Sequence, residues 1–248
     1  MKRHKPKGLS VATNTNDILT AINNHAAFAV VDKPNQTHPV YTTYDISCNE
    51  DFALHAKYHN WTRIFNFFKE HPTAMGSFAT KYVNPELTTF NPEGKIRIRF
   101  SLMPQKMADI HEPSTSKIID RIKAINDFIE AGYDVHINFS PVIVTDTWIE
   151  DYTQLFEGVD AIVDRKYKHK VLSEVIFLTH NKNKHIVNLS RIINSESTLW
   201  TPKNQEAKTS QYGGENIRYE HKLKREYIKD FISLHTKIIP WNTIRYIF

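Results

Sequence analysis

Apolar residues recur along this 248-residue chain with two periods, and each period predicts one kind of element. Apolar positions three or four residues apart fall on one side of a helix. Such spacing predicts helices over 16–25, 51–71, 114–131, 147–156 and 224–235. Alternating apolar and polar residues are typical of half-buried strands. Alternation predicts strands over 40–46, 74–83, 95–102, 133–144, 173–179 and 243–248.

Some local details of these elements also follow from the sequence. We expect Ser114 or Ser116 to cap the helix over 114–131 and Gly132 to end it. The strand over 133–144 should break near Pro141. The tract after 180 is expected to be rich in loops. The helix over 51–71 is expected to direct six apolar residues inward, namely Leu54, Tyr58, Trp61, Ile64, Phe65 and Phe68.

The order of these elements predicts an α/β fold. Strands alternate with helices as in parallel βαβ units, so we expect an α/β barrel or an open half-barrel. We expect one domain over 15–248, with a C-terminal extension and a basic, flexible segment over 1–14 before it. In such folds ligands gather at the carboxyl ends of the strands. We expect those ends to converge on one rim: Cys48-Asn49, Lys81, Ser101, Ser140-Pro141 and Thr179-His180.

Composition excludes several classes of protein without selecting one. The net charge of +5 is a mild excess that many proteins without a polyanionic partner share. The 7 glycines form no phosphate-binding loop. No run of about 18 apolar residues is present to cross a membrane, and no apolar stretch follows the basic start as in a secretory signal. The single cysteine cannot form an internal disulfide, which favours a reducing cytoplasm.

The histidines offer no clear metal motif. His55 and His59 have the spacing of a metal-binding helix but lack the glutamate of His-Glu-x-x-His. His180 and His185 follow a predicted strand. Because 13 histidines make such spacings common by chance, we expect hydrogen-bonded or surface histidines and no metal site.

Five segments of the chain form a recognisable set: SCNEDFALHAKY, GSFATKYVNPEL, GKIRIRFSLMPQ, HEPSTSKIIDRIKAINDFIEAGYDVHINFSPVIV and EVIFLTHN. In their order and spacing they resemble the spore photoproduct lyase family of the radical-SAM superfamily. The resemblance implies a partial (β/α) barrel of radical-SAM type whose first, cluster-bearing strand is missing from this chain. It also implies a [4Fe–4S] cluster and S-adenosylmethionine (SAM) as cofactors, and a thymine photodimer in DNA as substrate. The Cys-x-x-x-Cys-x-x-Cys that holds the cluster in the family is absent here, so the ligand set is incomplete.

The resemblance also implies roles for individual residues. Cys48 matches the cysteine that returns a hydrogen atom to the product radical. The alternative for a lone cysteine is a small buried hydrophobic residue. Lys81 would pair with the methionine carboxylate of SAM, and its alternative is a solvated lysine at a strand end. The other positions that match SAM contacts are Asn49, Ser101, Ser140 and Pro141.

The charged residues near these positions also allow two interpretations. Arg97 and Arg99 lie on the same side of their strand as Ser101. They either line a polar barrel interior or pair with acids such as Glu174, and we favour pairing, because buried charges need partners. Asp45, Glu50 and Asp51 resemble an acid cluster, but capping of the following helix is the better interpretation for Asp51.

A tract that mixes tyrosines with cations is the candidate for nucleic-acid contact. Tyr212 would stack on a base, while Arg218, Lys222 and Lys224 would reach phosphates. The alternative is a solvated loop and helix face, because Glu215, Glu220 and Glu226 dilute the charge.

Two hypotheses of different classes follow. In the first, the chain is a spore photoproduct lyase-like radical-SAM protein, a SAM-dependent DNA photoproduct lyase by resemblance. It would be truncated and inactive alone, with an upstream cluster-bearing segment as a partner. In the second, it is a non-catalytic DNA- or nucleotide-binding remnant of that fold. DNA is the expected macromolecular partner in both.

Overall fold

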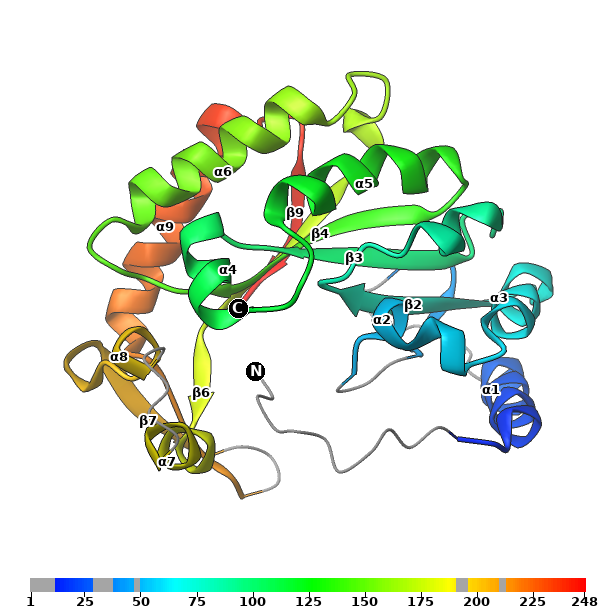
Figure 1. Ribbon diagram of the computed structural model, residues 1–248, viewed down its shortest axis with the longest axis horizontal. Coiled ribbons are helices and arrows are strands. Elements are labelled where there is room, and N and C mark those ends of the chain that lie inside the picture. Colours follow the sequence, from blue (N-terminus) through cyan, green and yellow to red (C-terminus); the bar gives the residue numbers. More distant parts are fainter. Residues whose placement is uncertain (1–11, 29–37, 47–49, 191–195, 210–212) are drawn as a thin grey trace.

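Six parallel strands form one curved sheet in the computed structural model of this chain, which describes residues 12–28, 38–46, 50–190, 196–209 and 213–248 (Figure 1). The strand order is β1-β2-β3-β4-β5-β9. The strands are β1 (Thr42–Asp45), β2 (Ala74–Thr80), β3 (Ile96–Leu102), β4 (Asp134–Val142), β5 (Leu172–Phe177) and β9 (Thr243–Ile247). The expected α/β half-barrel is therefore confirmed. Strand β1 lies at one edge of the described sheet.

Helices connect the strands and cover the outer face of the sheet (Figure 1). Helix α5 contacts β3 and β4, α3 contacts β2, and α6 packs on α9. The α-helices of this layer are α1 (Thr15–Phe28), α2 (Phe52–His55), α3 (Trp61–Glu70), α4 (Gln105–His111), α5 (Ile118–Glu130), α6 (Trp148–Ile162) and α9 (His221–Ile238). Short 3-10 turns lie at Ala56–Tyr58, Pro85–Thr89, Lys168–Lys170 and Pro202–Asn204. No helix in the described parts of the chain is long and apolar enough to cross a membrane.

A second, antiparallel sheet follows β5, at the carboxyl end of the main sheet. Its strand order is β6-β8-β7, with β6 (Thr179–Asn181), β7 (Gln205–Thr209) and β8 (Glu215–Tyr219). Helices α7 (Lys182–Ser190) and α8 (Glu196–Leu199) lie beside it (Figure 1). Only loops were expected in this tract. The strands are short, and the alternation within each one is too brief to signal a strand.

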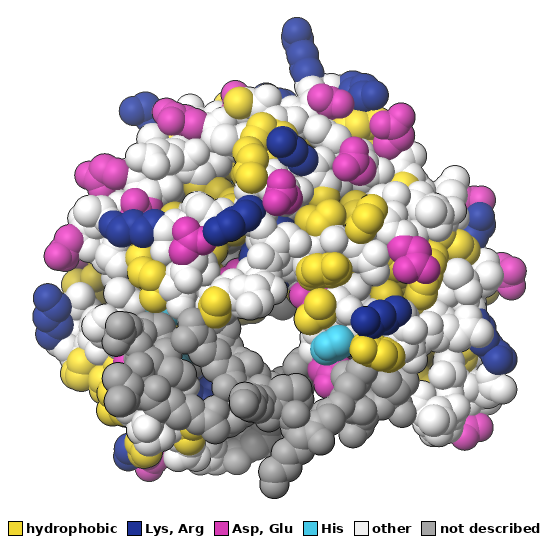
Figure 2. All heavy atoms as spheres, viewed as in Figure 1, with side chains coloured by type: hydrophobic (Ala, Val, Ile, Leu, Met, Phe, Trp, Pro, Cys, Tyr) yellow, Lys and Arg dark blue, Asp and Glu magenta, His cyan; other side chains and the backbone are white. Residues whose placement is uncertain are grey.

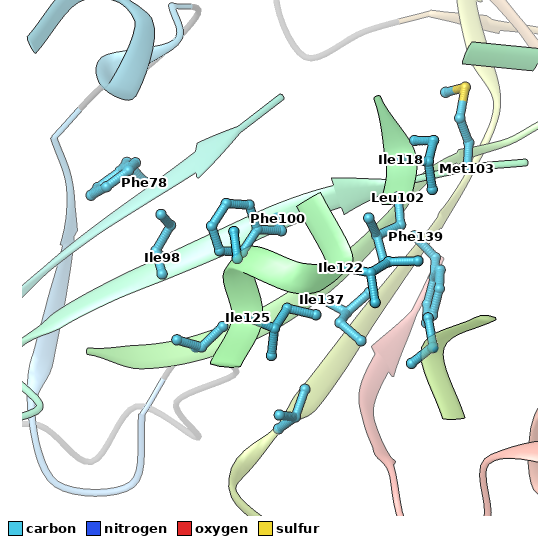
Figure 3. Close-up of a cluster of buried hydrophobic side chains, with 14 of the residues drawn as sticks. Phe78, Ile98, Phe100, Leu102, Met103, Ile118, Ile122, Ile125, Ile137 and Phe139 are labelled. Carbon is cyan, nitrogen blue, oxygen red and sulfur yellow. The ribbon is translucent and has the colours of Figure 1, made fainter. Parts of the chain in front are cut away.

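The core lies between the main sheet and its outer helices. Alternation in β3 directs Ile96, Ile98, Phe100 and Leu102 outward, and all four are fully buried. Helix α5 presents an apolar face to them through Ile118, Ile122 and Ile125, spaced by four and three residues. Figure 3 shows these side chains packed together with Phe139 of β4. Each such side chain contributes about 1.5–3 kcal/mol on burial, which makes this layer the main source of stability.

The same alternation directs polar residues to the inner face of the half-barrel. Arg97 pairs with Asp134 of β4 at 2.7 Å. Arg99 lies 3.1 Å from Asp45 of β1 and 3.7 Å from Glu174 of β5. The expectation that both arginines pair with acids is therefore confirmed. Because each pair joins different strands, the ionic contacts hold the inner face together across the sheet.

Glu174 is the most connected acid of this inner layer. Arg245 Nη1 lies 3.0 Å from Glu174 Oε1, and the Tyr246 hydroxyl donates to Oε2 at 2.7 Å. Burial acts to raise the pKa of Glu174, but hydrogen bonds from His136 and Tyr246 and the charge of Arg99 lower it to about 2. The carboxylate therefore stays ionised although only 3% of its side chain is exposed.

The prediction of a single helix over 51–71 is wrong. The chain forms α2, a 3-10 turn and α3 there. Asn60 is the cause: its side chain accepts a hydrogen bond from the Arg63 amide at 3.2 Å and begins α3. Because the segment is divided, residues 52–58 do not continue the buried face of α3. Leu54 is consequently 44% exposed and Tyr58 53% exposed, whereas Trp61, Phe65 and Phe68 are buried as expected.

The cap expected for the next helix is also wrong. Helix α5 begins after Lys117, which has an extended backbone and makes no side-chain cap. Ser116 instead accepts a hydrogen bond from the Val83 amide at 2.9 Å. The expected end is confirmed, since Gly132 adopts a positive φ of 94°. The expected break in β4 is confirmed as well, by a register shift between Phe139 and Val142.

We predict that Glu174→Gln lowers the free energy of unfolding near neutral pH by about 3 kcal/mol, because Arg99 and Arg245 lose a buried partner. The folded-state pKa lies below the usual 4.5, so the contribution is complete above that pH and is lost as the pH falls toward about 2. Urea unfolding at about pH 7 and about pH 3 measures both effects. The exposed Glu150→Gln serves as control, and an equal loss at both pH values would contradict the assignment.

Candidate functional site

The carboxyl ends of the central strands surround a pocket of about 670 Å³. Its lining comes from the ends of β2, β4 and β5, the start of the small sheet and the loop around α4. The face of the molecule seen in Figure 2 is hollowed near its centre, and hydrophobic side chains lie along part of the edge of this hollow. The polar residues that line the pocket include Lys81, His111, Glu112, Ser140, Thr179 and His180.

Three of the residues expected to contact SAM lie together in this pocket. Lys81 approaches from the end of β2, and Ser140 and Pro141 from the end of β4. Ser101 is not among the lining residues; it is 4% exposed, and its carbonyl accepts a hydrogen bond from Arg121 at 2.7 Å. Asn49 and Cys48 lie outside the described residues. The expected rim is thus present at three strand ends, since Thr179 and His180 after β5 also line the pocket, and Ser101 is buried beside it.

Lys81 is held by an acid that the sequence analysis did not single out. Its ammonium forms an ion pair with Glu112, whose side chain is fully buried. The other oxygen of Glu112 pairs with Arg121 at 2.9 Å, and Arg121 is also fully buried. Two cations therefore share one carboxylate, so the group carries a net charge of +1. Lys81, with 29% of its side chain exposed, is the member that faces the pocket.

Arg121 connects the pocket wall to helix α5. Its guanidinium donates to the Ser101 and Ser116 carbonyls at 2.7 and 2.9 Å and to the Thr115 hydroxyl at 2.6 Å. A planar guanidinium with five donors can fix several loop groups at once, which lysine cannot do. Arg121 therefore joins the end of β3 to the loop that carries Glu112.

The segment before α2 fixes Lys81 from the other side. Asp51 caps α2 by accepting from the Leu54 amide at 3.2 Å, so the capping interpretation is confirmed. The same carboxylate accepts from the Thr80 hydroxyl at 2.7 Å and the Lys81 amide at 2.8 Å. Asp45 and Glu50 do not join it: Asp45 pairs with Arg99, and Glu50 lies 3.7 Å from His55.

One acceptor on the inner face beneath the pocket lacks a hydrogen bond. Asn138 lies two residues before Ser140 on β4, so both point to the same face. Asn138 is 7% exposed, and its side-chain oxygen accepts no hydrogen bond from the described residues. A buried acceptor of this kind is costly and suits a ligand that brings a donor.

The expected nucleic-acid residues are only partly brought together. Arg218 of β8 pairs with Glu206 at 2.8 Å, so its charge is partly compensated. Burial, together with the charges of Arg218 and Lys208, lowers the pKa of Lys224, which places these three cations near one another. Lys222 lies two positions before Lys224, and residues so spaced on a helix point to different sides. Tyr212 lies outside the described residues. We call Lys208, Arg218 and Lys224 the basic patch.

Three histidines in and beside the pocket are hydrogen-bonded, as the sequence analysis expected for histidines that are not at the surface. His180 Nε2 lies 3.0 Å from a Glu196 carboxylate oxygen, and His185 Nδ1 lies 2.5 Å from the same oxygen. His111 Nε2 lies 2.9 Å from the Thr198 hydroxyl. Glu196 falls in the tract that was expected to be loops, and no sequence signal connected it to the two histidines.

Sequence reasoning missed Glu112 and Arg121, the residues that fix Lys81. Both belong to a segment quoted for the family resemblance, yet neither was given a role. One signal was available. The buried face of α5 is apolar except for Arg121, and Glu112 lies in the loop before this helix, where it can pair with that arginine. A second groove, of about 580 Å³, lies between α1 and α3. It is remote from the strand ends, so we do not assign the site to it.

We predict that Arg121→Met lowers the free energy of unfolding by about 3–5 kcal/mol, because it removes one of the two cations on a buried carboxylate. Lys123→Met on the same helix changes the same charge at an exposed position and should cost under about 0.5 kcal/mol. Urea unfolding followed by circular dichroism measures both. Similar losses for the two variants would show that the buried ion group does not stabilise the fold.

The comparisons with known proteins agree on one family. The profile of the family described as spore photoproduct lyase matches residues 8–248. The spore photoproduct lyase of Bacillus subtilis (strain 168) is 29% identical over 140 residues, 56% of this chain and 41% of that protein. The enzyme of Geobacillus sp. (strain Y412MC61) is 28% identical over 131 residues, 49% of this chain and 38% of that protein. The matched region thus spans about two fifths of these curated relatives.

Solved structures show the same fold. Spore photoproduct lyase complexed with dinucleoside spore photoproduct superposes with a TM-score of 0.81 at 19% identity, covering 96% of this chain and 68% of that chain. A mutant with bound AdoMet and dinucleoside spore photoproduct gives 0.81 at 18% identity, with the same coverage. With the family profile matched over nearly the whole chain, this protein belongs to the spore photoproduct lyase family of the radical-SAM superfamily.

Proposed function

We propose that the pocket at the strand ends binds SAM and that the chain is the SAM-binding half-barrel of a DNA photoproduct lyase. The observation that carries this proposal is the convergence of Lys81, Ser140 and Pro141 on one pocket of about 670 Å³. A structure with the same fold carries bound AdoMet and a dinucleoside photoproduct, which supports the same chemistry here.

The charges at the rim suit the methionine end of SAM. Lys81, Glu112 and Arg121 together carry +1, so a carboxylate that approaches Lys81 meets a net attraction. Charge-assisted hydrogen bonds of this kind are among the strongest in proteins. Because Arg121 continues to hold Glu112, Lys81 can turn to a ligand without leaving an unpaired buried acid.

The apolar lining of the pocket suits the adenine end. Met103, Ile143, Phe177, Leu178 and Leu199 supply this apolar surface, as is usual where a ring system binds. Ser140 and Pro141 supply the strand end that matches the adenine contact in the family. The buried oxygen of Asn138, one pleat deeper on the same face, is an acceptor for a ligand amino group.

The residues of this chain suit SAM, but they do not supply the ligands of a [4Fe–4S] cluster. A [4Fe–4S] cluster of this superfamily needs three cysteine thiolates, and the sequence holds 1 cysteine. We therefore assign no electron-transfer step to this chain; the thiolates would come from an upstream cluster-bearing segment. Cys48 keeps the role that the resemblance gives it: its thiol would return a hydrogen atom to the product radical.

We predict that the purified chain binds SAM and that Lys81→Ala weakens binding about tenfold or more, because the carboxylate loses its charged partner. Isothermal titration calorimetry measures both. The fold should survive, since Glu112 remains paired with Arg121. Lys106→Ala removes an exposed lysine of α4 and should leave affinity unchanged. Absence of binding, or equal binding by Lys81→Ala, would contradict the proposal.

For DNA we propose the basic patch as the contact surface, supported by the dinucleoside photoproduct bound in structures of the same fold. We predict that Lys208→Gln with Lys224→Gln reduces the slope of log affinity against log salt by up to about 2, because each phosphate contact releases a counterion. Lys229→Gln with Lys237→Gln removes the same charge elsewhere on α9 and is the control. Fluorescence anisotropy with a short single strand measures the slope, and equal effects of the two pairs would overturn the assignment.

A further inference from the structure

Two histidines and a glutamate from three different elements meet beside the pocket. His180 lies on β6, His185 on α7 and Glu196 on α8, three neighbouring elements of the small sheet region (Figure 1). One nitrogen from each ring and one carboxylate oxygen all lie within 4.8 Å of one another. His180 and Glu196 are 7% and 4% exposed. From this geometry we propose that His180, His185 and Glu196 form a binding site for a divalent transition-metal ion of the Zn²⁺ type.

The donor set matches the chemistry of zinc. Two imidazoles and one carboxylate form a known three-residue ligand set that leaves a fourth position for water. Hard oxygen-seeking ions such as Mg²⁺ and Ca²⁺ avoid such nitrogen-rich sites. Ligand atoms around a tetrahedral zinc stand about 3.3 Å apart, since each lies about 2.0–2.1 Å from the metal. The observed separations of 3.0 and 2.5 Å from the Glu196 oxygen are close to this, so a small outward shift would admit the ion.

Neighbouring residues hold the ligands as supporting residues do in metal sites. Asn188 donates a hydrogen bond to the other Glu196 oxygen, which orients the carboxylate. Trp200 stacks on the His185 ring with centroids 4.0 Å apart and an 8° angle between the planes.

The charge balance also favours a cation. Imidazoles bind metal ions in their neutral form, so the carboxylate of Glu196 supplies the formal charge of the ligand set and attracts a divalent cation. Because His180 also lines the pocket, the fourth coordination position would lie next to the proposed SAM site. The ion would hold β6, α7 and α8 together at that edge. The site is argued from the geometry of its own three residues and does not rest on the proposed function.

The test is zinc binding by the full chain without a purification tag, after treatment with EDTA. We expect calorimetry to show one Zn²⁺ per chain and Co²⁺ to give the visible absorption of a low-coordinate site. Glu196→Gln and His185→Ala should each weaken binding about tenfold or more. His169→Ala removes an exposed histidine elsewhere and should change nothing.

Each outcome of these titrations decides whether His180, His185 and Glu196 bind a metal ion. Glu196→Gln keeps the side-chain shape and one acceptor oxygen but removes the charge, so loss of binding with an unchanged circular dichroism spectrum supports the site. Absence of stoichiometric binding by the parent chain would mean that the three residues form a hydrogen-bonded cluster only. Binding that survives both ligand substitutions would place the metal on other histidines. Either of these two results overturns the proposal.

Discussion

Charge pairing inside the half-barrel is the constraint on which the rest of the structure depends. Alternation in β3 forces Arg97 and Arg99 to the inner face while Ile98 and Phe100 form the core under α5. A buried charge without a partner costs several kcal/mol, so acids must stand opposite these arginines on neighbouring strands. Asp134 and Glu174 do so, and their carboxylates stay ionised because the surrounding donors hold each pKa near 2. The strand register is therefore fixed from both faces, by apolar packing outside and by ion pairs inside.

The same constraint shapes the rim of the pocket. Glu112 is fully buried and takes two cations, one structural and one that faces the pocket. Arg121 alone keeps the buried carboxylate of Glu112 paired. Lys81 can therefore exchange Glu112 for the carboxylate of a ligand. A surplus cation next to an apolar wall suits a zwitterionic ligand with a ring system, so we propose SAM for this pocket and not for the groove beside α1. The family membership and the physical properties of the site both support this proposal.

The sequence predicted most of the main sheet and part of the site, for identifiable reasons. Long, regular patterns such as 95–102 were assigned correctly because both faces of the strand have strong and opposite preferences. The prediction of one helix over 51–71 was wrong because Asn60 is a capping residue that begins a new helix, although the apolar pattern continues across it. The family resemblance named Lys81, Ser140 and Pro141, which line the candidate pocket, and their contact with SAM stays a prediction. Glu112 and Arg121 were missed because their role arises only from contacts across separate segments. The cluster of His180, His185 and Glu196 was hidden for the same reason, since Glu196 lies beyond any local motif.

The functional assignment rests on SAM binding in the pocket between the ends of β2 and β4. A crystal structure of this chain with S-adenosylhomocysteine, which keeps the carboxylate and adenine of SAM, is the decisive experiment. We expect the carboxylate within hydrogen-bond distance of the Lys81 ammonium and the adenine beside Ser140 and Pro141. A ligand bound in the groove between α1 and α3, or one that leaves the contact of Lys81 with Glu112 unchanged and lies elsewhere on the surface, would contradict it.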